Sequence, residues 1–533
     1  MARCFNTAGI CYPEEHYMVN MEKRLQEIEG LVDQGAYFTI NRARQYGKTT
    51  VLNLLTERLS SRYAVLPVSF EGMSDDVYGT ESAFGKRVCG LLYNALSYHE
   101  AEGISEHSKS EWKRMGNADA VDTDLFMISN QITEMCREAD RPVILIIDEV
   151  DQASGQRIFL SFLGMLRDKY LKRRKQPAFQ SVILAGVYDI KNLKLKMRPD
   201  SVHQYNSPWN IAADFNVDMS FHVEDIARML GEYESDKHTG MDIFHISQEI
   251  YAYTSGYPFL VSRICKIMDE FLPEKRQEMF PDRASVWSQK GIGEAVKELL
   301  SESNPLFEDM VKKLQDFPGL KKMLYAALFH GEKFPYNPDV HEMNMGMIFG
   351  LLKNEQGTVA VANRIFETRL YNWFISEDIL DSKLYKAAAL DKNIFIQNGR
   401  LDMKKVLEHF AEAFTDIYAD AEETFLEENG RRFFLLYLKP IINGVGNYYV
   451  EARTRNMRRT DVIIDYCGKR YICELKIWHG KEYNERGEKQ LIGYLDDYHL
   501  SEGYMVSFNF NKNKKVGVRE LMIDGKRLVE AVV

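Results

Sequence analysis

Short β-forming runs, separated by segments of helical periodicity, fill the N-terminal part of the chain. These runs are residues 37–40, 64–70, 143–147 and 181–187. After the first run, Val51, Leu52 and Leu55 recur at helical spacing. The third run is continuously apolar, which is typical of a strand buried on both faces of a parallel sheet. The pattern therefore predicts an α/β fold with a parallel sheet in this part of the chain.

The pattern changes in the second half of the chain. Residues 306–331 have helical periodicity, and residues 348–374 read as a helix, a hairpin around Gly357 and another helix. From about residue 386 the order becomes helix, strand, hairpin, helix and strand, which predicts a second α/β module. An apolar helix of this module is expected to end at Pro440, because proline interrupts helical hydrogen bonding.

Charged residues interrupt the hairpin of this second module. Residues 459–480, RTDVIIDYCGKRYICELKIWHG, predict two strands joined by a Gly-containing turn. Because side chains alternate between the faces of a strand, Glu474 and Lys476 share one face. Asp461 opens the partner strand, so three ionisable residues gather in one patch. The ordinary alternative is a set of surface charges on the solvated face of an antiparallel strand.

Composition sets bounds on these predictions. A chain of 533 residues is too long for one hydrophobic core and predicts two to four domains. Hydrophobic content of 45% with 27% charged residues is ordinary for globular protein, which argues against global disorder. The formal charge of −10 argues against a generally basic nucleic-acid-binding coat. Contact with nucleic acid therefore depends on local basic clusters.

Cysteine usage and apolar runs bear on the compartment. The seven cysteines are odd in number and scattered, without a C-x-x-C pair, a pattern that suits reduced thiols in a cytosol. The first ten residues have no apolar core of a signal peptide, and the longest clean apolar run is the short one at residues 143–147. We therefore expect a cytoplasmic protein without a membrane span.

Residues 37–55, YFTINRARQYGKTTVLNLL, have the order strand, loop, Gly47-Lys48-Thr49 and helix. This is the order of a P-loop, in which backbone N–H groups and a helix N-terminus hold phosphate oxygens. Lys48 is expected to reach the β- and γ-phosphates of ATP, and Thr49 to coordinate Mg²⁺. The usual pattern has glycine at the position that Arg42 occupies here.

A second acidic element supports the P-loop. Residues 142–151, PVILIIDEVD, form a buried-strand pattern that ends in Asp148 and Glu149. Acids at the carboxyl end of a parallel strand lie in the crevice where α/β sheets bind ligands. We expect Asp148 to hold Mg²⁺ through water, and Glu149 to polarise the water that attacks the γ-phosphate.

The loop sequence also carries a family resemblance. Residues 42–49 read RxRxxGKT, and about the first 280 residues resemble the AAA-ATPase-like family of bacterial proteins, in which this pattern replaces the usual glycine-rich loop. The resemblance accounts for Arg42 and implies that Arg44 and Thr50 belong to the nucleotide site. It also implies that the turn at residues 256–258, GYP, opens a helix of a lid over the nucleotide.

Four residues are candidates for a contact with the γ-phosphate of ATP. Tyr188 and Asp189 follow the fourth β-forming run, where a polar residue could sense the γ-phosphate. Arg198 and Arg263 are further candidates, with an ordinary surface arginine as the alternative for each.

The charged hairpin carries a second resemblance. An acid that opens one strand and an E-x-K motif on its neighbour, here Asp461, Glu474 and Lys476, resemble the PD-(D/E)XK nuclease superfamily, as does the order of elements. The resemblance implies that Asp461 and Glu474 hold Mg²⁺ or Mn²⁺ against the scissile phosphate. Lys476 would then position the attacking water and offset negative charge.

The flanking helices supply the remaining nuclease candidates. Gln490 and Tyr494 match the Q-x-x-x-Y element of many members of that superfamily. A glutamate of the preceding helix often completes the metal site. Glu428 is our choice and Glu427 the alternative, because spacing alone does not fix the rotation of the helix.

Two basic clusters stand out in the acidic chain. One crowds the approach to Asp461 and comprises Arg453, Arg455, Arg458 and Arg459. Phosphate contacts would be useful at that place. The other spans residues 167–198, with ten Lys or Arg against two acids, and a solvated surface is the equal alternative there.

These patterns, together with the two resemblances, imply an α/β protein built from four parts. They are a P-loop ATPase domain with a parallel sheet, a helical lid, a winged-helix-like middle, and a restriction-endonuclease-like α/β domain, at residues 1–220, 221–280, 281–385 and 386–533. The expected function is an ATPase coupled to a metal-dependent nuclease that cuts DNA, in defence or mobile-element control by resemblance. The alternative is a nucleotide-switched signalling or DNA-binding protein whose C-terminal domain does not cut. A homo-oligomer is compatible with either function.

Overall fold

The computed structural model describes residues 3–98, 102–117, 122–153, 156–187, 209–329, 332–378, 382–397, 399–418, 427–442, 446–450, 462–478, 481–511 and 514–533. Contacts within the chain define two compact units. The first unit comprises Met1–Phe221, Tyr257–Phe259 and Ile348–Gly350, and the second comprises the rest of the chain.

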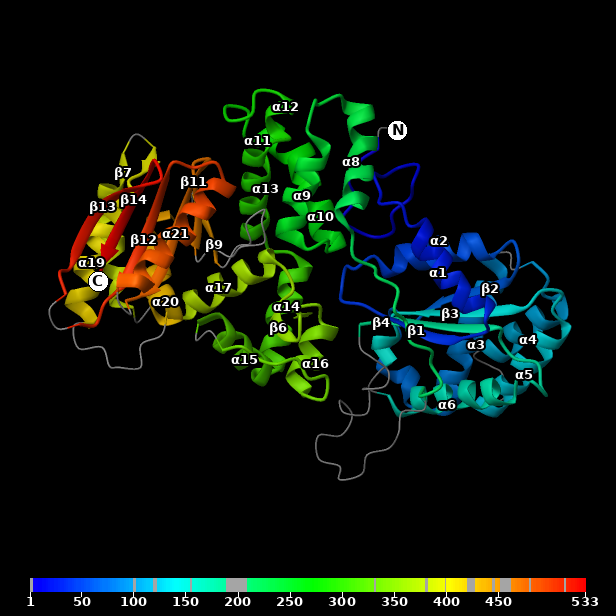
Figure 1. Ribbon diagram of the computed structural model, residues 1–533. Helices are drawn as coiled ribbons and strands as arrows, with labels where there is room; N and C mark the ends of the chain where they lie inside the picture. Colours follow the sequence, from blue (N-terminus) through cyan, green and yellow to red (C-terminus); the bar gives the residue numbers. More distant parts are fainter. Residues whose placement is uncertain are drawn as a thin grey trace. The chain divides into compact units, whose positions relative to one another are not determined.

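The first unit is built on a four-stranded sheet in the order β1-β4-β3-β2, with every neighbouring pair parallel (Figure 1). The strands are β1 (Tyr37–Asn41), β2 (Ala64–Ser69), β3 (Val143–Asp148) and β4 (Ser181–Gly186). The helices are α1 (Glu22–Asp33), α2 (Lys48–Leu59), α3 (Glu81–Tyr98), α4 (Glu106–Gly116), α5 (Leu125–Glu138) and α6 (Arg157–Lys172), with short helical turns η1 (Asp75–Tyr78) and η2 (Val150–Ala153). The predicted parallel sheet is confirmed.

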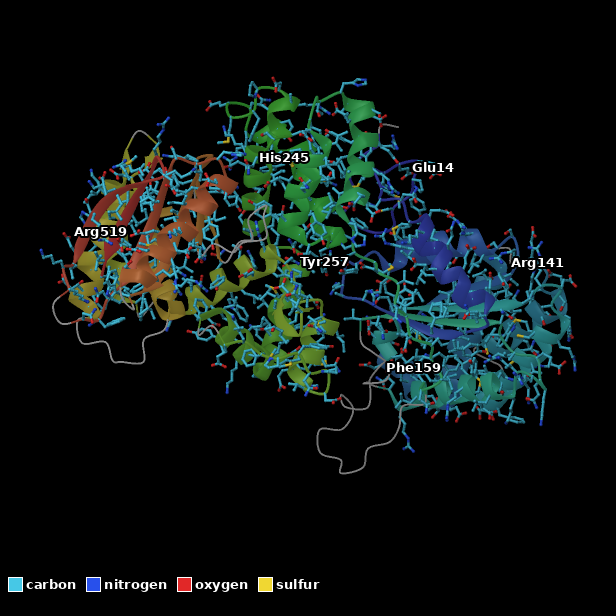
Figure 2. The ribbon with its side chains drawn as sticks, in the orientation of Figure 1. Glu14, Arg141, Phe159, His245, Tyr257 and Arg519 are labelled. Carbon is cyan, nitrogen blue, oxygen red and sulfur yellow. The ribbon has the colours of Figure 1, made fainter. Side chains whose placement is uncertain are left out.

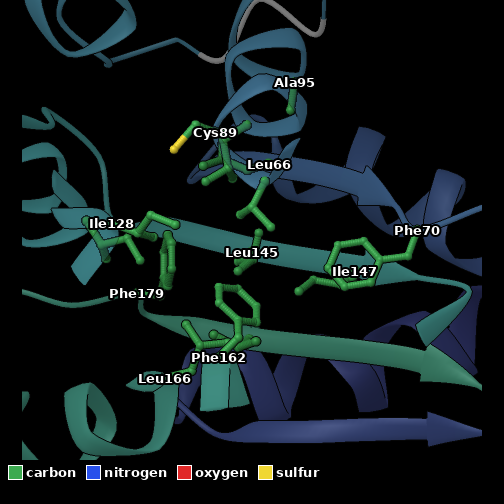
Figure 3. Packing of buried hydrophobic residues seen from close by; sticks show 14 of the residues in the cluster. Leu66, Phe70, Cys89, Ala95, Ile128, Leu145, Ile147, Phe162, Leu166 and Phe179 are labelled. Carbon is green, nitrogen blue, oxygen red and sulfur yellow. The ribbon is translucent and has the colours of Figure 1, made fainter. Parts of the chain in front are cut away.

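Separate hydrophobic clusters cover the two faces of this sheet. On one face α1 and α2 pack against residues such as Ile40 and Ile144. On the other, α3 to α6 enclose a larger cluster that includes Leu145, Ile147 and Phe162 (Figure 3). Every residue of β3 is buried, because both faces of a central parallel strand are covered by helices.

The second unit begins with a helical region. Its helices are α8 (Val223–Lys237), α9 (Ile243–Thr254), α10 (Pro258–Lys266), α11 (Leu272–Lys275), α12 (Arg283–Val286), α13 (Gln289–Ser301), α14 (Pro305–Asp316), α15 (Pro318–Phe329), α16 (His341–Ile348), α17 (Arg364–Asp378) and α18 (Lys383–Asp391), with a π-helical turn η4 at Ile267–Phe271. Strands β5 (Leu352–Glu355) and β6 (Thr358–Val361) form the predicted hairpin around Gly357, between α16 and α17. The predicted hairpin and the helix after it are confirmed, whereas the helix before the hairpin lies earlier than predicted and ends at Ile348.

A six-stranded mixed sheet forms the C-terminal part of the second unit, in the order β13-β14-β12-β11-β10-β9. Its strands are β9 (Gly446–Val450), β10 (Val462–Tyr466), β11 (Lys469–Ile477), β12 (Glu502–Phe508), β13 (Gly517–Ile523) and β14 (Lys526–Val532). The helices around it are α19 (Met403–Tyr418), α20 (Glu427–Ile442) and α21 (Lys481–Asp497), preceded by a short turn η5 (Lys392–Phe395) and the strands β7 (Ile396–Gln397) and β8 (Arg400–Leu401).

The close packing around two glycines shows which helix covers each face of this sheet. A Cβ at Gly503 of β12 would lie 2.9 Å from Leu495 of α21, so α21 packs on that face. A Cβ at Gly430 of α20 would lie 2.3 Å from the ring of Phe508, so α20 packs on the other face. The chain crosses from β11 through α21 to the parallel strand β12. The sheet is therefore enclosed between helices, and α21 is the helix that faces the Glu474 side of β11.

Two local predictions have clear outcomes. The charged hairpin forms as predicted, with Cys467 and Gly468 in the left-handed region of the turn between β10 and β11. The predicted helix end at Pro440 is wrong, because α20 continues to Ile442 with the proline inside it. Across the described ranges, no helix combines the length and apolar character that crossing a bilayer requires.

Candidate functional site

The P-loop joins the end of β1 to the start of α2. Gln45 and Gly47 both have left-handed backbone, with φ of 57° and 78°. Gly47 is the cap residue of α2, and a Cβ there would meet nothing within 4 Å, so the backbone angle rather than space favours glycine. The turn directs the chain into α2 at Lys48, and the first backbone N–H groups of a helix form a ready anion site.

Lys48 holds its charge inside this loop. Its side chain is buried, and Nζ donates to the carbonyl oxygens of Arg42 at 3.0 Å and Ala43 at 3.1 Å. The ammonium therefore lies within the loop that would surround a phosphate.

The Arg42 side chain anchors the start of the loop to a neighbouring segment. Its guanidinium donates to the carbonyl oxygens of Asn41 at 2.8 Å and Val217 at 2.6 Å. The same group lies 5.2 Å from the ring centre of Phe215. Arginine is therefore compatible with a P-loop here, because its side chain ties the loop to residues 215–217.

Thr49 and Asp148 meet although 99 residues separate them in sequence. The Thr49 hydroxyl donates to Oδ2 of Asp148 at 3.0 Å, and the backbone N–H of Glu149 donates to Oδ1 at 2.8 Å. One partner begins α2 and the other ends β3, so the parallel sheet brings them to one edge. A hydroxyl and a carboxylate oxygen are ligands that Mg²⁺ prefers.

Glu149 follows in a strained backbone conformation, with φ of 53°. The side chain is half-buried. Burial raises the pKa of Glu149, the neighbouring Asp148 raises it further, and Lys48 opposes the shift. A carboxyl group whose pKa is raised toward neutrality suits a group that accepts a proton from water.

The remaining predicted nucleotide residues occupy different settings. The Arg44 side chain is exposed, and its carbonyl oxygen accepts a hydrogen bond from the Tyr257 hydroxyl (Tyr257 is labelled in Figure 2). The Thr50 hydroxyl accepts from the backbone N–H of Cys11 at 3.2 Å. Tyr257 also places its ring edge-on to Tyr46, with centroids 4.8 Å apart.

Sequence reasoning placed Tyr257 in the turn that opens α10 but missed its bond to the loop. The two residues are 213 positions apart, so no local pattern indicates the contact. Arg263, a γ-phosphate candidate, instead pairs with Glu302, with Nη2 and Oε1 2.5 Å apart. Tyr188, Asp189 and Arg198 lie outside the described residues.

The second predicted site lies on β11. Glu474 is fully buried, and Nζ of Lys476 lies 3.1 Å from its Oε1. A Cβ at Gly487 of α21 would lie 3.3 Å from Lys476 and 3.6 Å from Met505, so the helix covers this pair. The alternative of a solvated strand face is therefore wrong for Glu474.

Several predicted nuclease residues lie wholly or partly outside the described residues. Asp461 and the cluster Arg453, Arg455, Arg458 and Arg459 lie outside the described residues. Glu427 and Glu428 begin α20, but their side chains are outside the description. Among the described residues no group of three or more His, Cys, Asp or Glu could hold a metal ion. The three-carboxylate metal site thus remains a prediction.

Gln490 and Tyr494 lie on α21, as predicted. Gln490 is exposed, and its amide nitrogen donates to the hydroxyl of the buried Tyr494, one turn along the helix. The pair therefore forms within the helix that covers Glu474.

A second buried acid, Glu530 of β14, was missed. Strand register places Glu474, Met505 and Glu530 in one row across β11, β12 and β14. Glu530 is fully buried, accepts from the Ser507 hydroxyl at 2.6 Å, and pairs with Arg519 (labelled in Figure 2). An acid flanked by apolar residues in the last strand was the available signal.

Comparison with known structures gives weak likenesses. A Walker-type ATPase of Pyrococcus abyssi has a TM-score of 0.45 at 15% identity, covering 69% of this chain and 99% of that chain. The ORC2 protein of Aeropyrum pernix, in ADPNP-ADP complexes, has a TM-score of 0.37 at 13% identity, covering 68% and 94%. The ORC1 protein of the same organism, in complex with DNA, has a TM-score of 0.30 at 12% identity, also covering 68% and 94%.

Comparison with curated proteins gives no match. A family model described as an AAA-like domain matches residues 11–271, a range that includes the P-loop, Asp148 and Glu149. The N-terminal part of this chain is therefore an AAA-like domain.

Proposed function

We propose that this protein binds and hydrolyses ATP in its AAA-like domain and that its C-terminal domain is a metal-dependent nuclease acting on DNA. The observation that carries the ATPase half is the 3.0 Å contact between Thr49 and Asp148, which joins a P-loop helix to the acid at the end of a parallel strand. In defence or mobile-element control, ATP would then gate cutting.

In the ATPase half, each residue has a distinct task. The first turn of α2 and Lys48 bind the phosphates, with Lys48 exchanging its loop carbonyl partners for phosphate oxygens. Thr49 and Asp148 would hold Mg²⁺, which would supply positive charge beside the phosphates. Glu149 orients and polarises the attacking water.

Two further residues complete the proposed nucleotide site. The exposed Arg44 side chain supplies positive charge at the loop. Thr50 supports the loop through its bond to the Cys11 backbone, and we retain it as a residue of the nucleotide site.

In the nuclease half, Glu474 is the central metal ligand. Asp461 directly precedes Val462, whose register partner is Cys473, the neighbour of Glu474. Support for a shared site comes from this adjacency and from the burial of Glu474, since a buried carboxylate needs a compensating cation.

The other proposed nuclease residues act around that ligand. Glu428, or Glu427 in its place, supplies a further carboxylate from α20. Lys476 positions the attacking water, and Gln490 of α21 assists near the site. The metal is Mg²⁺, with Mn²⁺ as a substitute.

We also propose the predicted division into an ATPase domain at 1–220, a lid at 221–280, a winged-helix-like region at 281–385 and a nuclease domain at 386–533. The hairpin β5–β6 between α16 and α17 supports the winged-helix reading of the third region.

One observation favours the alternative function, a nucleotide-switched protein whose nuclease-like domain binds DNA without cutting it. Lys476 lies 3.1 Å from Glu474 and already offsets its charge inside the domain. A buried ion pair can serve structure alone. An experiment must therefore distinguish a C-terminal domain that cuts DNA from one that only binds it.

Nucleotide titration of the full chain tests the ATPase half. Lys48→Ala should weaken ATP binding by about 100-fold or more, because it removes the buried cation of the loop. Lys23→Ala, an exposed lysine on α1, is the matched control and should bind as wild type. Equal affinity of Lys48→Ala and wild type would remove the basis for the proposed ATP site.

A further inference from the structure

A groove of about 860 Å³ lies along α3 in the first unit. The residues that line it come from the segment before α3, from α3 itself, and from the end of α4 with the residues that follow it. Its size falls within the range of about 300–1,000 Å³ that is typical of ligand sites. It lies on the α3 side of the sheet, the face opposite to α1 and α2.

One face of α3 forms the long wall of the groove. Lys86, Arg87, Gly90 and Asn94 recur at helical spacing and all line it. The end of α4 lies close to α3 at Gly90, because a Cβ at Gly116 would lie 2.8 Å from the Gly90 backbone nitrogen. The two helices meet there, and residues of both line the groove.

The groove is basic although the chain as a whole is acidic. Among the described residues that line it, Lys86, Arg87 and Lys113 are cationic and Asp122 is the one carboxylate. Asp122 accepts a hydrogen bond from the Ser82 hydroxyl at 3.2 Å, which ties it to the wall. In a chain of formal charge −10, this local excess of positive charge requires a separate explanation.

The two acids of α4 pair with basic residues of the same helix. On α4, Glu106 pairs with Lys109 at 2.7 Å, and Glu111 pairs with Arg114 at 2.8 Å. Each pair lies within one helix at i, i+3 spacing. The acids of α4 therefore have basic partners on their own helix.

The walls are held in place by buried contacts. Thr123 is fully buried, and its hydroxyl donates to the carbonyl oxygen of Met115 at 3.1 Å. A Cβ at Gly85 would lie 2.2 Å from the Thr123 carbonyl oxygen, so this segment lies directly on α3. These contacts hold the described walls of the groove in place, which lowers the entropic cost of binding.

We propose that this groove binds the sugar-phosphate backbone of nucleic acid. Three cations along one groove match a row of phosphates, and Lys113 lies 5.5 Å from the ring centre of Tyr93, which supplies an aromatic surface beside them. This site is separate from the C-terminal domain and goes beyond the proposed function, because it requires neither ATP hydrolysis nor DNA cutting.

Fluorescence anisotropy with labelled single-stranded DNA, and with a duplex of the same sequence, tests the site in the full chain. Glu474→Gln is used as the background so that cutting cannot affect the readout. Lys113→Glu should weaken binding by roughly tenfold and reduce the slope of log affinity against log salt by about 1. Lys23→Glu, an exposed lysine on α1 across the sheet, carries the same change of charge and should leave both quantities near the background values.

Cross-linking locates the contact independently of affinity. DNA with photoreactive bases should cross-link to the α3 peptide that contains Tyr93 in the background protein, and less so in Lys113→Glu. Equal effects of Lys113→Glu and Lys23→Glu, with cross-links confined to the C-terminal domain, would overturn the inference.

Competition identifies the class of ligand. Polyglutamate should displace DNA from the groove far less effectively than unlabelled DNA does. Equally effective displacement would overturn the assignment to nucleic acid and indicate an acidic protein partner. Failure of ATP binding or of DNA cutting is measured in separate assays, so loss of the proposed function and loss of this site are distinguishable.

Discussion

The P-loop and the β11 site both combine acids with a lysine, but in opposite settings. At the P-loop, Lys48 is held by carbonyl oxygens of the loop, and the acids lie at the carboxyl edge of a sheet. On β11, Glu474 lies within a strand, is fully buried beneath α21, and has a lysine for its ion-pair partner. The first site is defined largely by backbone geometry, and the second by side chains alone.

This difference sets how firmly each function can be inferred. A loop that turns through left-handed residues into a helix N-terminus presents backbone N–H groups that suit an anion. A buried carboxylate with a lysine can be a metal site or a structural ion pair. The ATP assignment therefore depends on geometry that is already present, whereas the nuclease assignment depends on chemistry that must be measured.

The largest expected effect separates hydrolysis from binding at the P-loop site. Glu149→Gln should lower ATP turnover by roughly 10²- to 10⁴-fold, because the amide cannot accept a proton from the attacking water. ATP affinity should be retained, since Lys48 and the start of α2 are unchanged. Turnover and nucleotide affinity are measured on the same preparation.

Glu71→Gln is the control for this prediction. Glu71 is exposed and close enough to influence Glu149 electrostatically, so its substitution changes the local charge without removing the proposed base. If both variants lost turnover equally, Glu149 would have no special part in hydrolysis.

The next prediction concerns the buried pair on β11. Lys476→Met should lower the free energy of unfolding by about 3 kcal/mol, because it removes a cation 3.1 Å from a fully buried carboxylate. The long apolar side chain of methionine keeps most of the packing. Adding Glu474→Gln should restore much of the loss, since the buried charge is then removed too.

Lys526→Met is the matched comparison. Lys526 is 16% exposed, close to the 14% of Lys476, and its Nζ lies 2.9 Å from Asp496. Asp496, however, is 65% exposed, so this pair should contribute about 1 kcal/mol or less. Similar losses for the two lysines, measured by chemical denaturation, would contradict a special role for the burial of Glu474.

A smaller effect is expected from pH. Burial and the charge of Asp148 raise the pKa of Glu149 in the folded protein. Ionisation of Glu149 therefore favours the unfolded chain, and wild type should lose stability relative to Glu149→Gln as pH rises from about 4 through the folded pKa. Below about pH 4 the carboxyl group is protonated in both states, and the difference should vanish.

Calorimetry in the absence of nucleotide measures this difference in stability between wild type and Glu149→Gln. The transition to follow is the one whose melting temperature rises when ATP is added. Glu27→Gln, at an exposed position on α1, should not diverge from wild type over the same pH range. A constant difference between Glu149→Gln and wild type at every pH would show that the substitution acts through packing rather than charge.

The smallest effect concerns the bond from Tyr257 to the Arg44 carbonyl. Tyr257→Phe removes one hydrogen bond to the P-loop and should weaken ATP binding by roughly fivefold, as expected for about 1 kcal/mol. Tyr251→Phe removes a hydroxyl from a half-buried tyrosine of α9 and should bind ATP as wild type. Unchanged ATP affinity in Tyr257→Phe would show that this hydrogen bond does not contribute to ATP binding.

How much the sequence predicts depends on whether a contact is local. Gly47, Lys48 and Thr49 are consecutive, and Asp148 follows a strand whose parallel pairing is readable from its apolar run, so this site is found from pattern. The partners of Arg42 could not be predicted, because its guanidinium donates to backbone carbonyl oxygens, including that of Val217, which any residue type presents.

The C-terminal sheet shows which features of a site the sequence does not predict. The hairpin and its charged residues follow from alternation along two neighbouring strands. Glu530 joins the same row only because β14 lies beside β12 in the sheet, an order that strand spacing does not reveal. The burial of Glu474 depends on α21 crossing that face, which is again a long-range packing result.

Cutting of DNA by the full chain, with Mg²⁺ or Mn²⁺ and with ATP, is the most direct test of the central claim. Wild type should cut, Glu474→Gln should lose cutting by on the order of 10³-fold or more through loss of a metal ligand, and Glu530→Gln should cut as wild type. Glu530 is as buried as Glu474 and is also paired with a cation, so it controls for neutralising a buried acid. Absence of cutting by wild type on every DNA tested, or equal cutting by Glu474→Gln, would contradict the nuclease assignment.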